Sequence, residues 1–331
     1  MVQNKKIISG LDAIKFIMAL FIVDIHVKGS NVLPPPILGS LIHPFEGLAV
    51  PTFFVISAFL FFSKLRKQSK QLQCLAHYEK RLLVLYGFWT IVWMPIILMQ
   101  RTEYRQGSVF HGICLIVKDF FLKDTFDASW FFVALLIGVP VIYGLGKVFT
   151  EWGVWIIPFG LRQIIYHTSE MPISIQKGLH WFIDNINPNP GLSFLEGLLW
   201  ISIGYILSNG KVVDTIKRIP NKIAWLSVLA YFLLEGYIPY VGQILVVIML
   251  FISAYTWNLP SNDILYKRLR VYSIIFYCVH DSFKKIPKYL FSSMHNGPLL
   301  YVITLIVCWL SSEIIIRMKD VRGFQWLRYA Y

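Results

Sequence analysis

The chain has 331 residues, of which 56% are hydrophobic and 15% charged, and its mean hydropathy is +0.60. This is more apolar surface than a soluble core of this size requires, so the composition excludes an ordinary soluble domain and indicates a polytopic membrane protein. The net charge of +13 is what basic loops on one side of a membrane produce, and it does not require a nucleic-acid partner.

Ten segments of about 17–22 mostly apolar residues are long enough to cross a hydrocarbon core of about 30 Å. They predict an all-α bundle of about ten transmembrane helices in one integral-membrane domain, residues 1–331. In chain order the segments are 11–27, 47–63, 82–99, 129–147, 152–168, 193–208, 222–237, 239–257, 271–289 and 298–316. The fifth is the weakest of these because it contains Arg162 and Gln163, and the seventh is almost continuous with the eighth.

The basic residues predict the orientation of the bundle. If the N-terminus is cytoplasmic, 20 of the 31 Lys and Arg residues fall on the cytoplasmic side and nine on the opposite side. The positive-inside rule therefore favours two cytoplasmic termini and an even number of spans. Asp24 and His26 interrupt the end of the first apolar run, and no small-residue cleavage site follows, so we expect this helix to be retained.

Lys15 and His26 stand eleven residues apart in the first span, LDAIKFIMALFIVDIHV. Eleven steps of about 100° end about 20° past three full turns, so both side chains share one helix face, about 16 Å apart along the axis. An ionisable group near the bilayer centre costs about 2.5–3.5 kcal/mol, so this face should line protein or water. We expect it to border a working cavity.

The roles of these residues stay open at this level. His26 could act as a general base or be a structural histidine held by a neighbouring helix. Lys15 could hold a phosphate or carboxylate, extend to the cytoplasmic interface, or pair with Asp12. Asp24 projects away from both and should find a structural partner on another helix.

Four later residues are further candidates. Ser57 lies in the aromatic second span and Trp130 opens the fourth, while Glu196 and His280 lie inside the sixth and ninth spans. A membrane serine usually bonds its own backbone, and a terminal tryptophan is often an interfacial belt residue. A buried carboxylate, in contrast, needs a partner and is a functional candidate by default.

Two polar segments suggest ligands. The cytoplasmic segment 64–81 contains six basic residues and could bind anionic lipid head groups or an anionic co-substrate. The external segment 169–192 combines aromatic rings with amides and carboxylates, as a sugar-binding surface or an interfacial helix would. Its residues of interest are His180, Trp181, Asp184, Asn185, Asn187 and Asn189. The four cysteines are scattered without metal-ligand spacing, so no metal site and no disulfide framework is predicted.

Five motifs in order resemble the membrane-bound acyltransferase 3 family. They are Lys15 with His26, AVPTFFVISAFLF at 49–61, WFFVALL at 130–136, FLEGLLWISIGYIL at 194–207 and YSIIFYCVH at 272–280. The family pattern is an arginine or lysine, ten residues and a histidine in the first helix, followed by an FFVxSG-like second helix. The resemblance extends over about residues 9–320.

This resemblance implies a bacterial inner-membrane O-acyltransferase. Such an enzyme moves an acyl group, usually acetyl, from acyl-CoA to a hydroxyl of a glycan or lipid-linked sugar, and acetyl-CoA is a co-substrate rather than a resident cofactor. His26 is then the catalytic histidine and Lys15 its basic partner. His26 either deprotonates the acceptor hydroxyl or forms a transient acyl-histidine, and the four later candidates contact acyl-CoA or acceptor.

The chain departs from the family pattern in three places. Lys15 stands where arginine is commoner, which removes bidentate recognition of an anion. Ala58 replaces a glycine, and Asp281 follows His280 where proline is frequent. A transporter or flippase for a glycan-lipid or anionic solute is the alternative, because it would use the same buried titratable groups.

Overall fold

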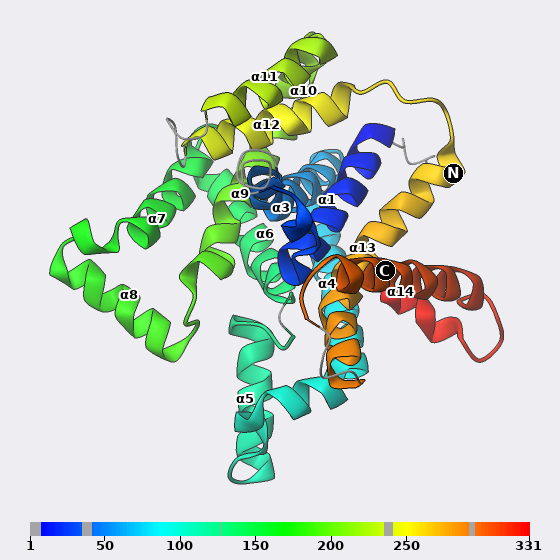
Figure 1. Cartoon of the computed structure of the whole chain (residues 1–331). Helices are drawn as coiled ribbons and strands as arrows, with labels where there is room; N and C mark the ends of the chain where they lie inside the picture. Colours follow the sequence, from blue (N-terminus) through cyan, green and yellow to red (C-terminus); the bar gives the residue numbers. More distant parts are fainter. Residues whose placement is uncertain (1–7, 35–41, 127, 235–240, 291–294) are drawn as a thin grey trace. The chain divides into compact units, whose positions relative to one another are not determined.

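The computed structural model describes residues 8–34, 42–126, 128–234, 241–290 and 295–331, and the regular elements in these ranges are all helices (Figure 1). The all-α prediction is therefore confirmed for this part of the chain. The helices group into two compact units, one formed by Met1–Ile56 with Gly210–Tyr331 and the other by Ser57–Asn209. Each unit is described by itself below.

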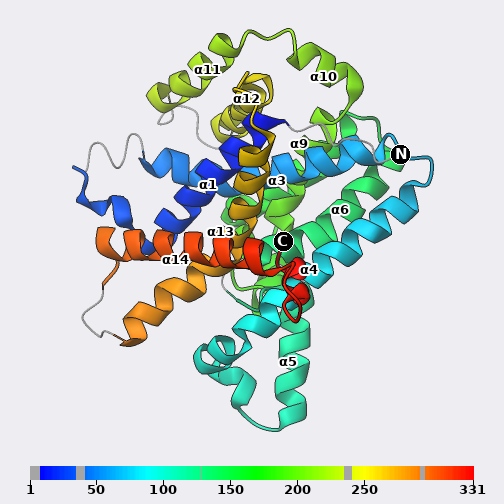
Figure 2. The same ribbon diagram turned by 90° about the vertical axis from the view of Figure 1, so that its right-hand side faces the viewer.

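The first unit contains both ends of the chain. Its helices are α1 (Ser9–Val27), the first half of α3 (His43–Leu65), α10 (Gly210–Ile216), α11 (Asn221–Leu234), α12 (Val241–Thr256), α13 (Asp263–Leu290) and α14 (Pro298–Met318). α1 packs against α12, α13 and α14, and α13 and α14 lie side by side in both views (Figures 1 and 2). Leu11, Met18 and Ile22 of α1 are buried in this packing.

A glycine sets the distance between α1 and α12. A Cβ atom added to Gly10 would lie 2.0 Å from the backbone oxygen of Ala254. Because that neighbour is backbone rather than a flexible side chain, the residue at position 10 must be glycine for the two helices to approach this closely. The close approach brings the polar start of α1 into the interior of the unit.

The second unit contains the middle of the chain. Its helices are the second half of α3, α4 (Gln71–Gln100), α5 (Val109–Leu122), α6 (Trp130–Val148), α7 (Ile156–Tyr166), α8 (Ile173–Asn185) and α9 (Phe194–Leu207). α9 packs against α6 and α7, and nearly all of its residues are buried. This explains its uniformly apolar sequence, since a helix surrounded by neighbours has no polar face.

Tyr86 of α4 organises the turn before α6. It is fully buried and stacks on Phe120 with a centroid distance of 4.2 Å. Its hydroxyl accepts a hydrogen bond from the Thr125 backbone N–H at 3.1 Å, and that N–H also reaches Ser129 Oγ at 2.9 Å. These bonds satisfy polar groups that would otherwise be costly to bury, and they fix the start of α6.

The structure bears out part of the predicted set of spans. By length and composition, α3, α4, α6 and α14 can each cross a membrane, and α9 and α12 are shorter apolar helices. α1 is long enough but carries Asp12, Lys15 and Asp24, and α13 carries several more charges. These features make the chain an integral membrane protein.

One predicted span is corrected, another is described only in part, and one helix was not predicted. The predicted span 152–168 contains α7, whose 11 residues extend about 16 Å, too short to cross the hydrocarbon core alone. α11 is described to Leu234, and the end of the predicted seventh span lies outside the described residues. α5 was not predicted as a helix, although its 14 residues are strongly apolar.

Candidate functional site

His26 lies in the last turn of α1 and faces α13. Its Nδ1 is 3.4 Å from Lys284 Nζ and 3.9 Å from Asp281 Oδ1. Its ring centroid is 4.8 Å from that of His280. The His26 side chain is 29% exposed, so the ring is held by three polar neighbours on one helix and is still accessible to a ligand.

His280 is completely buried beneath this group. Its Nδ1 lies 2.9 Å from the backbone oxygens of both Phe276 and Tyr277, one turn earlier in α13. Its Nε2 is buried and has no hydrogen-bond partner among the residues that the structure describes. The prediction that His280 lies inside the bundle is confirmed, and the structure brings it next to His26.

Asp281 connects two lysines beside His26. The aspartate is buried and forms ion pairs with Lys284 and, at 2.5 Å, with Lys285. Residues three and four positions apart share one face of a helix, which is why both lysines reach the same carboxylate. Two cations and one anion give this group a net positive charge next to the His26 ring.

Lys15 is buried nearer the start of α1. Its ammonium lies 5.1 Å from the centroid of the Phe53 ring on α3, a favourable cation–π arrangement. Asp12, one of the partners considered for it, instead forms a bidentate ion pair with Arg270, with distances of 2.8 and 2.7 Å. Lys15 is therefore enclosed in the unit, and the Asp12 carboxylate takes Arg270 rather than Lys15 as its hydrogen-bond partner.

Asp24 has contacts of the structural kind that its position predicts. One partner lies just after α1 itself, and the other lies on another helix, as expected. Its Oδ1 accepts a hydrogen bond from the Ser30 backbone N–H at 3.0 Å, in the turn that follows α1. The carboxyl also lies next to Glu46 of α3. Asp24, two residues before His26, thus stabilises the end of α1 rather than orienting the imidazole.

Glu196, in the second unit, has the buried partner that the sequence demanded. Its Oε1 accepts hydrogen bonds from Arg162 Nε at 3.1 Å and from Trp200 Nε1 at 3.0 Å. The Arg162 guanidinium also lies 5.0 Å from the centroid of the Tyr166 ring. Arg162, whose charge weakened the fifth predicted span, is buried because this ion pair and these rings surround it.

Ser57 and Trp130 also belong to the second unit. Ser57 lies in the middle of α3 and is half-buried. Trp130 begins α6 and is buried, so its ring is enclosed by protein and is not an exposed belt residue. Contacts of Ser57 and Trp130 with the acyl donor or acceptor remain predictions.

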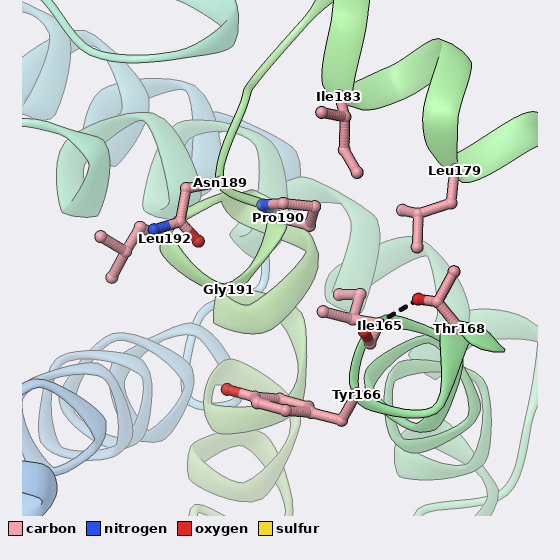
Figure 3. A pocket seen from close by; sticks show the side chains of 9 residues that line it. All are labelled: Ile165, Tyr166, Thr168, Leu179, Ile183, Asn189, Pro190, Gly191 and Leu192. Carbon is pink, nitrogen blue, oxygen red and sulfur yellow. Dashed lines mark hydrogen bonds between the residues drawn. The ribbon is translucent and has the colours of Figure 1, made fainter. Parts of the chain in front are cut away.

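A pocket of about 490 Å³ opens at the segment 169–192, for which the sequence predicts a sugar-binding surface or an interfacial helix (Figure 3). Asn189, Thr168 and Tyr166 supply its polar groups, and the other lining residues are Ile165, Leu179, Ile183, Pro190, Gly191 and Leu192. Thr168 Oγ1 donates to the Ile165 oxygen at 3.0 Å, as Figure 3 shows. The polar surface of the pocket is thus small.

Most of the predicted sugar-binding residues lie elsewhere. Residues 173–185 form helix α8, on which His180, Trp181, Asp184 and Asn185 are exposed. Asn187 is buried and uses its side chain within its own turn, accepting from the Asn189 N–H at 2.9 Å. Among these six residues, Asn189 alone lines the pocket of Figure 3.

Sequence reasoning missed Lys284, Lys285 and Arg270 as members of these groups. The signal was present in the spacing, because Asp281, Lys284 and Lys285 fall at i, i+3 and i+4 on one helix. Arg270 is one and a half turns before Phe276 on the same helix and could not be assigned to Asp12 without knowing that α1 packs on α13. Long-range pairing of this kind is not encoded in local spacing.

A membrane-embedded bundle that carries a half-exposed histidine among buried charges is the architecture of a membrane enzyme or a transporter. The family comparison decides between these classes. The model of the acyltransferase 3 family, described as an acyltransferase domain, matches residues 8–313. The chain therefore belongs to this family and is a membrane acyltransferase, and the resemblance found in the five motifs is confirmed. No curated protein and no solved structure matches the chain.

Proposed function

We propose that the chain transfers an acyl group, most simply acetyl, from acyl-CoA to a hydroxyl of a glycan or lipid-linked sugar at the bacterial inner membrane. The observation that carries this proposal is the His26 imidazole, accessible on one side and held among Lys284, Asp281 and His280 on the other. General acid–base catalysis of acyl transfer needs such a ring within reach of a hydroxyl.

The proposed path of the acyl donor begins at the cytoplasmic face. Five of the six basic side chains in the segment 64–81 are exposed and can attract the phosphates of a CoA: Lys64, Lys67, Lys70, Lys80 and Arg81. Arg66 is different, because it is bound to Glu151 through two hydrogen bonds of 2.6 and 2.9 Å. We propose that buried Lys15 supplies a further positive charge between this face and His26.

The proposed topology follows the positive-inside rule. We propose about ten crossings with both termini in the cytoplasm, the fifth made by α7 together with the 3-10 turns Gly153–Trp155 and Thr168–Glu170 that flank it, because α7 alone is too short. In this topology the segment 64–81 is inside and the pocket of Figure 3 is outside. We therefore propose the pocket-bearing segment 169–192 as the part of the chain nearest to the glycan. The sugar itself is not specified by the small polar lining.

Radiolabelled acetyl-CoA tests the proposal. Purified membranes are incubated with a glycolipid or polysaccharide fraction, comparing the wild type with His26→Ala at equal abundance. His111→Ala is the matched control, because His111 is exposed on α5. We expect label in a hydroxylamine-labile ester with the wild type and the control, and its loss with His26→Ala. Equal labelling in all three proteins, across acceptors and acyl chain lengths, contradicts the proposal and favours transport.

A further inference from the structure

The two histidines next to Asp281 make hydrogen bonds that fix different ring nitrogens. In a neutral imidazole one nitrogen carries the proton and the other a lone pair, and the neighbours decide which. His26 Nδ1 has a lysine side chain within hydrogen-bond distance and the Asp281 carboxylate farther away, at 3.9 Å. His280 Nδ1 has two backbone carbonyl groups. This difference has a chemical consequence, because a lysine ammonium can only donate and a carbonyl oxygen can only accept.

His280 carries its proton on Nδ1. Two carbonyl oxygens, of Phe276 and Tyr277, lie 2.9 Å from this atom, and neither can donate. The Nε2 of the neutral ring is therefore an acceptor. It is fully enclosed and has no donor among the described residues, although its ring lies against that of His26. A buried acceptor without a donor is costly, so its retention calls for an explanation.

His26 has the opposite arrangement. Its Nδ1 faces Lys284 Nζ at 3.4 Å, and the Asp281 carboxylate that pairs with this lysine is 3.9 Å from Nδ1, beyond hydrogen-bond distance. A lysine ammonium can only donate. Nδ1 must therefore accept, and the proton of the neutral ring is on Nε2. The lone pair of His280 and the N–H of His26 are thus complementary groups on two rings whose centroids are 4.8 Å apart.

We propose that His280 is a positioning residue for His26: its Nε2 lone pair accepts the His26 Nε2 proton, which leaves Nδ1 of His26 as the atom that takes the proton of the acceptor hydroxyl. This inference rests on the proposed function. Acid–base histidines are commonly oriented by a buried group that accepts one ring N–H and so fixes the tautomer. No hydrogen bond joins the two rings in the structure, and we expect one to form once substrates are in place.

The reaction balances without another reactant. The hydroxyl oxygen forms a bond to the acyl carbon while its proton moves to Nδ1 of His26. The carbon–sulfur bond then breaks, and the thiol sulfur takes that proton from Nδ1, which restores the neutral ring. Lys284 gives up Nδ1 to the hydroxyl but keeps its ion pair with Asp281, and its cation stays beside the oxygen on which negative charge develops.

Nitrogen NMR of the protein labelled with ¹⁵N-histidine tests the tautomers independently of activity. His26→Gln and His280→Gln assign the two rings among the eight histidines of the chain. At neutral pH we expect the proton of His26 on Nε2 and that of His280 on Nδ1. The same tautomer on both rings, or an imidazolium at either position, overturns the inference.

Lysine variants separate the two partners of His26. In Lys284→Met we expect His26 to keep its proton on Nε2, because His280 still accepts it. In Lys284→Met combined with His280→Leu the preference should be lost and both tautomers should appear. Lys285→Met is the matched control, because Lys285 binds Asp281 at Oδ2, and it should leave the His26 signals unchanged. A switch to Nδ1–H in Lys284→Met alone contradicts the role of His280.

Kinetics give a second readout. We expect His280→Leu to lower kcat about 100-fold with little change in KM for the acyl donor, and His280→Gln to restore much of it, because its amide oxygen can accept. Equal losses in the two variants would indicate a purely structural residue. If no acyl transfer is found but the tautomers are as expected, the proposed function fails while the arrangement of the rings stands. If transfer depends on His26 but the tautomers agree with each other, the inference alone fails.

Discussion

Asp12 and Arg270 form an ion pair between residues 258 positions apart in the sequence. Asp12 is buried, and the Arg270 side chain is 31% exposed. We expect Asp12→Asn to destabilise the protein by about 2 kcal/mol, because it leaves a partly buried guanidinium without its carboxylate. Thermal unfolding in detergent measures the loss.

An exposed ion pair provides the control for this prediction. Asp320 and Arg328 lie 2.9 Å apart with both side chains more than half exposed. Exposed pairs contribute little, so Asp320→Asn should leave the unfolding temperature almost unchanged. Equal effects of Asp12→Asn and Asp320→Asn would contradict the stabilising role assigned to the pair with Arg270.

At the residue scale, the sequence predicted which polar side chains lie inside the protein better than it predicted their partners. The eleven-residue spacing predicts that Lys15 and His26 share one face of the helix, because helix geometry is local. Lys15 is buried, and the His26 side chain is 29% exposed. The partners Arg270, Lys284 and Arg162 come from other helices or other turns. Their choice depends on tertiary packing, which hydropathy and spacing do not contain.

At the scale of elements, the contact between α1 and α12 can be tested at Gly10. A methyl group there would meet the Ala254 backbone oxygen at 2.0 Å. We expect Gly10→Ala to cost about 1–3 kcal/mol, as overpacking of a tight contact does. Gly144→Ala in α6 is the control, since nothing lies within 4 Å of its added Cβ. A Gly10→Ala protein as stable as the control would show that α1 and α12 can separate without penalty.

The segment 64–81 offers a kinetic test of the proposed donor path. Replacing Lys67 and Lys70, both exposed, by Gln should raise KM for acyl-CoA several-fold with kcat unchanged, because surface charges steer an anionic substrate. The effect should shrink at high salt. If KM is unchanged while activity loses its dependence on anionic lipid, the segment binds head groups instead.

Element prediction succeeded where hydropathy alone determines the ends of a helix and failed where polar residues or 3-10 turns determine them. α3, α6 and α14 begin and end within a few residues of the predicted spans. α7 is shorter than the predicted span because one 3-10 turn precedes it and another, with polar residues, follows it. α4 is longer because its polar first turns continue the helix before the apolar run begins.

At the scale of the whole molecule, the native cysteines test the proposed topology. Cys114 is exposed on α5, in a segment proposed to lie outside, and Cys74 is half-buried in the first turn of α4, on the cytoplasmic side. A maleimide that cannot cross the membrane should label Cys114 in intact cells and Cys74 only after permeabilisation. Cys278 and Cys308 are buried and should react only after unfolding. The reverse order for Cys114 and Cys74 would invert the bundle.

The pairing of Asp12 with Arg270 also constrains how the protein is made. α1 leaves the ribosome with Asp12, Lys15 and Asp24, yet the arginine that neutralises Asp12 is synthesised 258 residues later. Three ionisable side chains within 19 residues disfavour the insertion of α1 into lipid by itself. We therefore expect chains that stop before α13 (Asp263–Leu290) to be held by insertion machinery or degraded, because α1 is stable in the membrane only after α13 has been made.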